Sequence, residues 1–281
     1  MLSIMLSIIF KYNIMFSILY IYLLLNVVYS YGFNIHKYLG KLTDVYLNEF
    51  EPILYNKILN ILDSDIASIS SWADKIKRKK EYDWSRQLHY IDILECRKDL
   101  YTKDIIDKYC ENNCVVSALQ NFTYTLKYNL IQPEMNLTNA DILKFIIHFI
   151  QDISQPMHLL GYEKGGNSLK LIINQNNKNR TTNLHFLWDT MLPEFFIKKY
   201  TYHFPKICIN NVYNNLDNNL LGNLDSILLD ILNKNIKQVA CKIYPDTDYI
   251  VFDEYFNSNY FITLFDNYYF IMISTLKYIF N

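Results

Sequence analysis

The sequence predicts an all-α protein with a single domain. Hydrophobic residues make up 51% of its 281 residues, whereas glycine and proline number only 6 each. Few turn-forming residues and long periodic apolar stretches are typical of a mostly helical fold. The length is sufficient for one domain with a substantial core. Apolar positions recur at helical spacing in residues 36–48, 51–77, 102–110, 114–129, 139–154, 183–200, 224–243 and 258–280.

The chain begins with a nearly uninterrupted apolar stretch, residues 1–28, that contains a single lysine. Both a secretory signal peptide and a membrane anchor have this composition. The small residue Ser30 at the end of the stretch suits cleavage. We therefore expect residues 1–30 to be a signal peptide and the mature domain, residues 31–281, to be secreted or to enter the lumen of the secretory or endosomal pathway.

The segment 161–182 interrupts the helical pattern. It contains Gly161, Gly165 and Gly166 followed by a polar stretch, so we expect a loop or a short hairpin. The asparagine-rich run 210–219 is expected to form a surface loop.

The apolar stretch 260–280 has a composition close to that of a membrane span. Asp266, Asn267 and Lys277 interrupt it, and its apolar positions recur at helical spacing. We therefore expect a buried helix at this place.

Cysteines and sequons are compatible with a secreted chain. Disulfides are the usual state of cysteines outside the cytosol, and an odd number leaves one thiol unpaired. Sequons occur at Asn121, Asn136 and Asn179, although an asparagine-rich chain contains some by chance. The five cysteines are Cys96, Cys110, Cys114, Cys208 and Cys241.

Histidine and aspartate form the clearest chemical pattern. The formal net charge is −1, so no overall basic field indicates a nucleic-acid-binding protein. His148 and Asp152 are four residues apart in a predicted helix, so their side chains project from one face within reach of one ion. His185 and Asp189 repeat this spacing. One such pair is more commonly a polar contact in a core, but two pairs among only six histidines favour a metal site.

Other candidate ligands surround these pairs. Pro156 is expected to end the helix and to return His158 toward the same site. Asp74 and His89 are weaker candidates, because each alone is more commonly structural. Lys77 begins a run of four basic residues, 77–80. We expect the other three to lie on a solvated surface.

Seven segments resemble the zinc-dependent single-strand-specific nucleases and 3′-nucleotidases, in the order of that family. The most specific are HFIQDISQPMHLLGYEKGGN at 148–167 and NLHFLWDTMLPE at 183–194. The others are SWADKIK at 71–77, LHYID at 88–92, NNCVVSAL at 112–119, ACKIYP at 240–245 and LKYIF at 276–280. The resemblance implies a helical fold shared with zinc phospholipases C, a cleft with three zinc ions, and cleavage of single-stranded DNA or RNA to 5′-mononucleotides or of 3′-nucleotides.

Carried over position by position, the resemblance implies three ligand sets. The first ion would be bound by Asp74, His89, His148 and Asp152. The second would be bound by His158, His185 and Asp189. The third would be bound by His36, by Asp152 as a bridge, and by the amine and carbonyl of Tyr31.

The resemblance also implies roles beside the ions. Asp74 would orient the nucleophile, and Lys77 would stabilise the transition state. The substrate base would be contacted by Tyr90, Asp92, Gly165 and Asn167, with Gly166 allowing the backbone to approach. The implied disulfides are Cys96–Cys241 and Cys110–Cys114, which leave Cys208 free, and His203 has no assigned role.

Two positions depart from the family. Its mature chain begins with tryptophan where this chain has Tyr31, and the glycine before its helix aspartate is Gln151 here, which reduces the space beside Asp152. A zinc phospholipase C is an alternative enzyme, disfavoured by Asp189 where those enzymes have glutamate. A zinc-stabilised surface protein without activity is the alternative from another class. Neither a stable protein partner nor an oligomeric state follows from the sequence.

Overall fold

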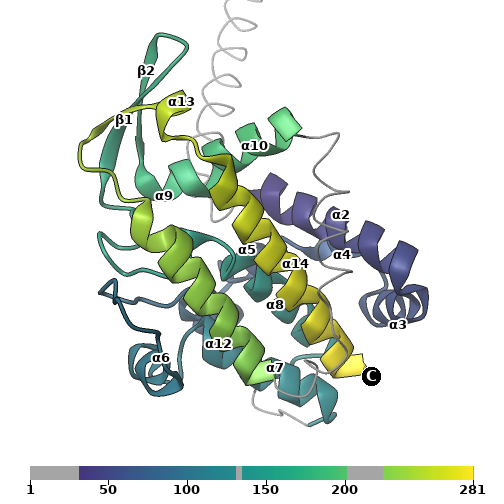
Figure 1. Ribbon diagram of the computed structural model, residues 1–281. Coiled ribbons are helices and arrows are strands. Elements are labelled where there is room, and N and C mark those ends of the chain that lie inside the picture. Colours follow the sequence, from purple (N-terminus) through teal and green to yellow (C-terminus); the bar gives the residue numbers. More distant parts are fainter. Residues whose placement is uncertain (1–31, 131–134, 201–223, 281) are drawn as a thin grey trace, which may run out of the picture. The chain divides into compact units, whose positions relative to one another are not determined.

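The computed structural model describes residues 32–130, 135–200 and 224–280. Helices dominate this part of the chain, and they are accompanied by one small three-stranded sheet (Figure 1). The predicted all-α class is therefore confirmed. Some predictions lie outside the described residues: the signal peptide 1–30, Tyr31, His203, Cys208 and the loop 210–219.

The helices before the sheet supply most of the candidate ligands. They are α2 (Phe33–Phe50), α3 (Pro52–Leu62), α4 (Ile66–Ile69), α5 (Trp72–Ile76), the 3-10 helix η1 (Lys80–His89), α6 (Lys103–Cys110), α7 (Val115–Lys127), α8 (Asn139–Asp152) and the short 3-10 turn η2 (Pro156–His158).

The second part of the chain contains the sheet and the longest helix. Its elements are β1 (Lys170–Gln175), β2 (Lys178–Asn183), α9 (Leu184–Phe186), the π-helical turn η3 (Leu187–Met191), α10 (Leu192–Tyr200), α12 (Leu224–Lys234), the π-helical turn η5 (Asn235–Val239), the 3-10 turn η6 (Ala240–Lys242), β3 (Tyr249–Val251), α13 (Phe252–Tyr255) and α14 (Ser258–Phe280).

The periodic stretch 51–77, expected to be helical, is divided into three helices. Asp63 ends α3 with a left-handed backbone, φ 51°, which few residues other than glycine, asparagine and aspartate adopt readily. Asp65 then begins α4, where its carboxylate accepts a hydrogen bond from the amide of Ser68 at 2.6 Å. The turn between the helices allows both α3 and α4 to contact α2.

Glycine permits α2 and α4 to approach each other closely. A Cβ atom added to Gly40 would lie 2.3 Å from Oγ of Ser70 and 2.8 Å from Cα of Ala67. Such a contact is sterically excluded, so any side chain at this position would push the two helices apart. The backbone at Ser70 is therefore close to α2, the helix that carries His36.

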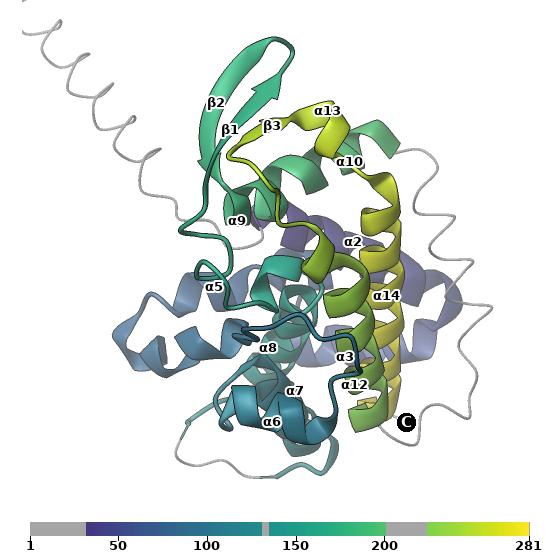
Figure 2. The ribbon, with the colours of Figure 1, turned by 60° about the vertical axis from the view of Figure 1, so that its left-hand side comes forward.

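The segment 161–182 contains the hairpin expected there. Strands β1 and β2 pair antiparallel from Lys170↔Asn183 to Gln175↔Lys178, and β3 pairs parallel with β1 (Figure 2). The two residues of the turn, Asn176 and Asn177, have φ values of 53° and 60°. Asparagine tolerates these values, which suit a tight hairpin turn. Strand β2 runs directly into α9, where His185 lies.

The core is organised around α14. This helix lies beside α12 in both ribbon views and also contacts α3, α7, α8 and α10 (Figures 1 and 2). Its bounds match the predicted stretch 258–280, and its inward residues, such as Tyr268 and Met272, are completely buried. Among the described residues, no helix combines the length and the apolar character needed to cross a membrane.

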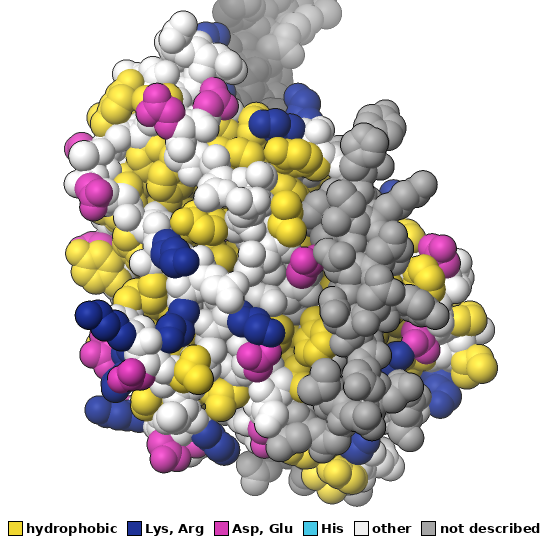
Figure 3. Space-filling model, viewed as in Figure 1, with side chains coloured by type: hydrophobic (Ala, Val, Ile, Leu, Met, Phe, Trp, Pro, Cys, Tyr) yellow, Lys and Arg dark blue, Asp and Glu magenta, His cyan; other side chains and the backbone are white. Residues whose placement is uncertain are grey.

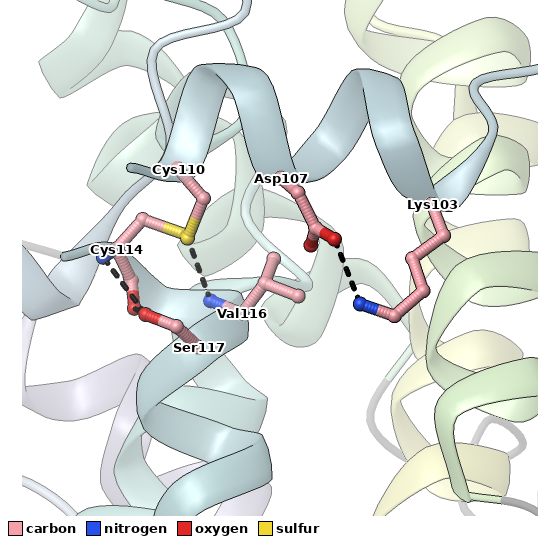
Figure 4. The surroundings of a disulfide bond; sticks show 6 residues. All are labelled: Lys103, Asp107, Cys110, Cys114, Val116 and Ser117. Atoms are coloured by element: carbon pink, nitrogen blue, oxygen red, sulfur yellow. Dashed lines mark hydrogen bonds and ion pairs between the residues drawn. A yellow bond between two sulfur atoms is a disulfide. The ribbon is translucent and has the colours of Figure 1, made fainter. Parts of the chain in front are cut away.

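Two disulfides occur among the described residues. Cys96–Cys241 joins the segment after η1 to η6, across 145 residues of sequence. Cys110–Cys114 joins the end of α6 to the start of α7 (Figure 4). Sγ of Cys114 also accepts a hydrogen bond from the amide of Val116 at 3.3 Å, which caps α7. Both pairs are those that the resemblance implies.

Candidate metal centre

Helix α8 presents an imidazole and a carboxylate on one face. Thr138 caps its N-terminus by accepting a hydrogen bond from the amide of Asp141 at 3.1 Å, and Asp152 is its last residue. His148 lies one turn earlier, with Nε2 3.1 Å from Oδ2 of Asp152. Both side chains are completely buried. The i,i+4 spacing therefore places two potential ligand atoms at one point inside the protein.

Helices α5 and η1 bring two further side chains to this point. Oδ1 of Asp74 lies 3.5 Å from Nε2 of His148. Nδ1 of His89, at the end of η1, lies 2.8 Å from Oδ2 of Asp152 and 3.7 Å from Oδ1 of Asp74. Ligand atoms of Asp74, His89 and His148 all lie within 4.8 Å of one another. Two weak sequence candidates thus meet the stronger pair.

A second group is formed by His158, His185 and Asp189, whose ligand atoms also lie within 4.8 Å of one another. His158 follows Pro156 at the end of η2, as the sequence predicts. Nε2 of His185 lies 3.2 Å from Oδ2 of Asp189, and Nε2 of His158 lies 3.9 Å from Oδ1 of the same residue. The pair His185 and Asp189 is therefore joined by His158 from another element, η2.

Asp152 lies between the two groups. Its Oδ2 faces His89 and His148, whereas its Oδ1 is 3.2 Å from Nδ1 of His158. One carboxylate therefore contacts side chains of both groups, which is the geometry that a bridging ligand needs.

His36 of α2 approaches the same carboxylates. Its Nε2 is 3.8 Å from Oδ1 of Asp152 and 3.6 Å from Oδ2 of Asp74, and its ring stacks on His148 with centroids 4.2 Å apart. Ligand atoms of His36, His148 and Asp152 form a third group within 4.8 Å. This group includes His148, which the resemblance assigns to another ion. Tyr31, expected to complete the set, is outside the described residues.

Hydrogen bonds behind the rings orient two of the histidines. Nδ1 of His148 donates to the carbonyl oxygen of Ser70 at 2.7 Å, and Nδ1 of His185 donates to that of Gly165 at 2.8 Å. A carbonyl oxygen only accepts, so Nδ1 carries a proton and Nε2 is the nitrogen that faces the carboxylates. Gln155 similarly donates to Oδ1 of Asp189.

These supporting residues were not identified from the sequence. The carbonyl of Ser70 has no side-chain signature, and Gln155 lies inside the matched segment 148–167 without an assigned role. Gly165, which the resemblance places near the base, has φ 61° and supports His185 through its carbonyl. A Cβ atom there would lie 2.6 Å from the carbonyl oxygen of Met157, so the position requires glycine.

Burial and neighbouring charges shift the pKa values of the side chains around Asp152. Burial disfavours its charged form, but His148, His158 and His89 outweigh burial and hold the pKa of Asp152 well below its usual range. Burial also opposes the charge on His148, yet Asp152 and Asp74 raise the pKa of His148 to about 10. For His36 and His89 burial is the largest effect and lowers the pKa of each ring to about 4.

Several potential ligand atoms lack hydrogen-bond partners among the described residues. They are buried and include Oδ1 of Asp152, Nδ1 of His158 and Oδ2 of Asp189. Buried polar atoms are normally satisfied, so a group of unsatisfied lone pairs needs a cation. Imidazole nitrogens and carboxylate oxygens are the donors that zinc accepts. The residues present therefore fit zinc.

Lys77 lies beside the centre. Its ammonium nitrogen is 2.6 Å from Oδ1 of Asp74, and its side chain retains 21% of its exposure. Its charge acts on both His89 and His185, disfavouring protonation of each ring. Lys77 is therefore close to both metal groups while still being accessible from solvent.

Tyr90 and Asp92 follow His89 along an extended segment. The amide of Ile91 donates to the carbonyl of His158 at 2.8 Å, and the amide of Val115 donates to that of Tyr90 at 3.1 Å. These bonds fix the backbone directly after His89. The Tyr90 side chain is half-buried, and Asp92 is exposed. The Tyr90 hydroxyl donates to Oε1 of Gln87 at 2.6 Å.

The loop that contains Asn167 is closed by its own hydrogen bonds. The Asn167 amide nitrogen donates to the carbonyl of Lys164 at 2.9 Å, and the side chain is exposed. Gly166 has φ 78°, and its amide donates to the carbonyl of Tyr162 at 3.1 Å. The geometry thus supplies a glycine turn, but it assigns no base contact to Asn167.

The face drawn in Figure 3 displays mixed acidic, basic and apolar side chains but no histidine among the described residues. This agrees with the burial of the five histidines considered above, of which only His185 is more than slightly exposed. The metal groups are therefore internal features of the fold.

The family model described as S1/P1 Nuclease matches residues 31–261. Endonuclease 4 of Arabidopsis thaliana is 33% identical over 204 residues, which cover 69% of this chain and 66% of the relative. Nuclease S1 of Aspergillus oryzae is 35% identical over 141 residues (48% and 46%), and Nuclease P1 of Penicillium citrinum is 34% identical over 140 residues (48% and 47%). The chain thus spans less than two thirds of the length of these relatives.

Proposed function

Because the chain belongs to the S1/P1 nuclease family, we propose that it is a zinc-dependent phosphodiesterase that cleaves single-stranded DNA or RNA to 5′-mononucleotides and also acts on 3′-nucleotides. This family is zinc-dependent, and the chain has His/Asp groups that can hold metal. The observation that carries the proposal is the position of Asp152, which contacts ligand candidates of both metal groups.

The proposed ligand assignment uses three ions. Asp74, His89, His148 and Asp152 would bind the first, His158, His185 and Asp189 the second, and His36, Asp152 and the backbone of Tyr31 the third. The unsatisfied buried atoms of Asp152, His158 and Asp189 support this assignment. Because Tyr31 contributes a free amine in this scheme, residues 1–30 would be removed as a signal peptide, leaving a nuclease domain at 31–281.

Secretion agrees with the covalent structure. Disulfides persist in oxidising compartments and are rare in the cytosol, and two are present here. We propose that the mature protein acts outside the cell or in the lumen of the secretory or endosomal pathway.

When bound, zinc would neutralise phosphate oxygens and make water nucleophilic near neutral pH. The chain's own residues act around this chemistry. Asp74, held by Lys77 at 2.6 Å, can orient the attacking water through its second oxygen. The Lys77 ammonium can bind a non-bridging phosphate oxygen, where negative charge accumulates during the reaction.

Tyr90 would supply the selectivity for single strands. It is half-buried and directly follows the ligand candidate His89 in the chain, so its ring is proposed to lie where a nucleobase attached to the reacting phosphate can stack on it. Stacking of this kind accepts every base but requires it to be unpaired. Asp92 and Asn167 are proposed to contact the base edge, and Gly165 and Gly166 to let the backbone approach the base closely.

The test combines metal analysis with a choice of substrates. Elemental analysis by inductively coupled plasma mass spectrometry should find about three zinc ions per chain in the purified mature protein. It should release 5′-mononucleotides from single-stranded DNA and RNA, act slowly on duplexes, and lose activity with a chelator. One zinc ion or none in the active protein would refute the scheme. Cleavage of phosphatidylcholine in preference to DNA would identify a phospholipase instead, and no activity on either would indicate a surface protein.

A further inference from the structure

Gln151 is a completely buried amide that precedes Asp152 in α8. Its Oε1 lies 2.6 Å from Nδ1 of His36. Its Nε2 lies 3.3 Å from the carbonyl oxygen of His36 and 3.2 Å from Oγ of Ser70. One side chain therefore contacts both the ring and the backbone of His36, and also the residue whose carbonyl holds His148.

The partners determine which way the amide points. The carbonyl oxygen of His36 only accepts, so the group that faces it is the nitrogen of Gln151. The hydroxyl of Ser70 donates its proton to the carbonyl of Ile66 at 2.7 Å, so toward Gln151 it also accepts. The amide oxygen is then the atom that faces Nδ1 of His36.

This orientation determines the tautomer of His36. The amide oxygen cannot donate, so the proton of their hydrogen bond belongs to Nδ1. The lone pair is consequently on Nε2, the nitrogen that faces Asp74 and Asp152 at 3.6 and 3.8 Å. A metal ligand needs this arrangement, in which one ring nitrogen donates outward and the other presents its lone pair.

We propose that Gln151 is the positioning residue of His36 and thereby sets the affinity of the third zinc ion. This inference rests on the proposed function, and it concerns a position where the resemblance leads one to expect glycine. A glycine has no side chain with which to hold the ring. In this chain the ring of His36 is therefore held by an amide that a family member with glycine does not have.

Two variants separate positioning from packing. Gln151→Met keeps an unbranched side chain of similar size but removes both hydrogen-bonding groups. Gln151→Glu keeps an oxygen that can accept from Nδ1 of His36. Asn233→Leu serves as a control, because Asn233 is another buried amide and donates to the carbonyl of Tyr101 at 2.9 Å, where none of the proposed ligands lies.

The measurement is zinc content at buffered free zinc concentrations, with the processed full chain. We expect three zinc ions in the wild type, and a loss of affinity of about 10–100-fold for one of them in Gln151→Met, which is typical for removal of such a support. Gln151→Glu should retain the third ion. Asn233→Leu should lower the unfolding temperature without changing the zinc content.

Nitrogen NMR of histidine-labelled, zinc-free protein provides a second readout. The wild-type His36 signal should be that of the Nδ1–H tautomer, and Gln151→Met should lose this preference. Wild-type affinity for all three ions in Gln151→Met would overturn the inference while leaving the proposed function intact. Fewer than three ions in the wild type would instead contradict the proposed three-ion ligand assignment, and with it the role of Gln151 at a third ion.

Discussion

Nδ1 of His148 donates a hydrogen bond to the carbonyl oxygen of Ser70, 2.7 Å away, at the centre of the protein. Ser70, which accepts this bond, lies in the short connection between α4 and α5. Gly40 lets this connection lie close to α2. The local backbone of one segment therefore determines which nitrogen of a distant histidine faces Asp74 and Asp152.

Replacement of His148 with alanine should abolish turnover. The variant loses a ligand candidate that contacts both Asp74 and Asp152, so the ion they share should bind weakly. We expect activity on single-stranded DNA to fall at least about a thousandfold, since the metal supplies the main catalytic effect. Zinc analysis and circular dichroism of the same sample distinguish loss of metal from loss of fold. Full activity would exclude His148 as a ligand.

Acidification should destabilise the zinc-free protein between pH 6 and pH 5. Burial lowers the pKa of His36 and of His89 to about 4 in the folded state, whereas an unfolded histidine titrates near 6.5. In this window the unfolded chain binds more protons, so stability falls as the pH falls. The expected loss is about 1 kcal/mol for each ring.

Urea unfolding of chelator-treated protein at the two pH values measures this loss. The raised pKa of His148 has little influence in this window, because that ring is charged in the folded state at both pH values. Replacement of His89 with glutamine should reduce the pH dependence by about half. Equal stability at pH 6 and pH 5 would contradict the prediction.

Processing before Tyr31 should be required for full activity. In the proposed scheme the amine of Tyr31 binds the third ion, and an amine exists there only after cleavage following Ser30. N-terminal sequencing of the exported protein should therefore read Tyr-Gly-Phe-Asn. A mature chain with one additional alanine before Tyr31 should bind one zinc ion less. If that chain is fully active, the N-terminus has no role at the metal.

Replacement of Tyr90 with alanine should affect nucleic acid more than a simple ester. Loss of base stacking is expected to cost about 1–3 kcal/mol, so cleavage of a single-stranded oligonucleotide should fall at least about tenfold. Cleavage of a phosphodiester without a base should change little. Replacement with phenylalanine is the matched control, because it keeps the ring and removes only the bond to Gln87. An equal loss on both substrates would mean that Tyr90 supports the metal ligands instead.

The sequence was most informative where side chains repeat at a helical interval. The spacing of His148 with Asp152, and of His185 with Asp189, predicts pairs that the structure brings to 3.1 and 3.2 Å. Apolar periodicity likewise predicts α14 with its observed bounds. These features are local, so a few residues and the geometry of one helix are sufficient to predict them.

Features that depend on contacts between distant segments were not predictable in this way. The left-handed residue Asp63 divides a stretch whose apolar periodicity continues through it. The hydrogen bonds of His148 to Ser70 and of His36 to Gln151 join residues 78 and 115 positions apart. Such pairs follow only from the packed structure, because a backbone carbonyl or an amide leaves no periodic mark in the sequence.

The position of α14 in the core has a consequence for synthesis of the chain. Its Tyr268 hydroxyl hydrogen-bonds Thr43 of α2 at 2.7 Å, and the helix packs on α8. The ribosome therefore produces every histidine of the metal groups before it produces the helix that contacts α2 and α8, the helices of His36 and His148. A nascent chain that ends before Ser258 carries the ligands without a closed core, so translation of α14 is the step that makes stable metal capture feasible.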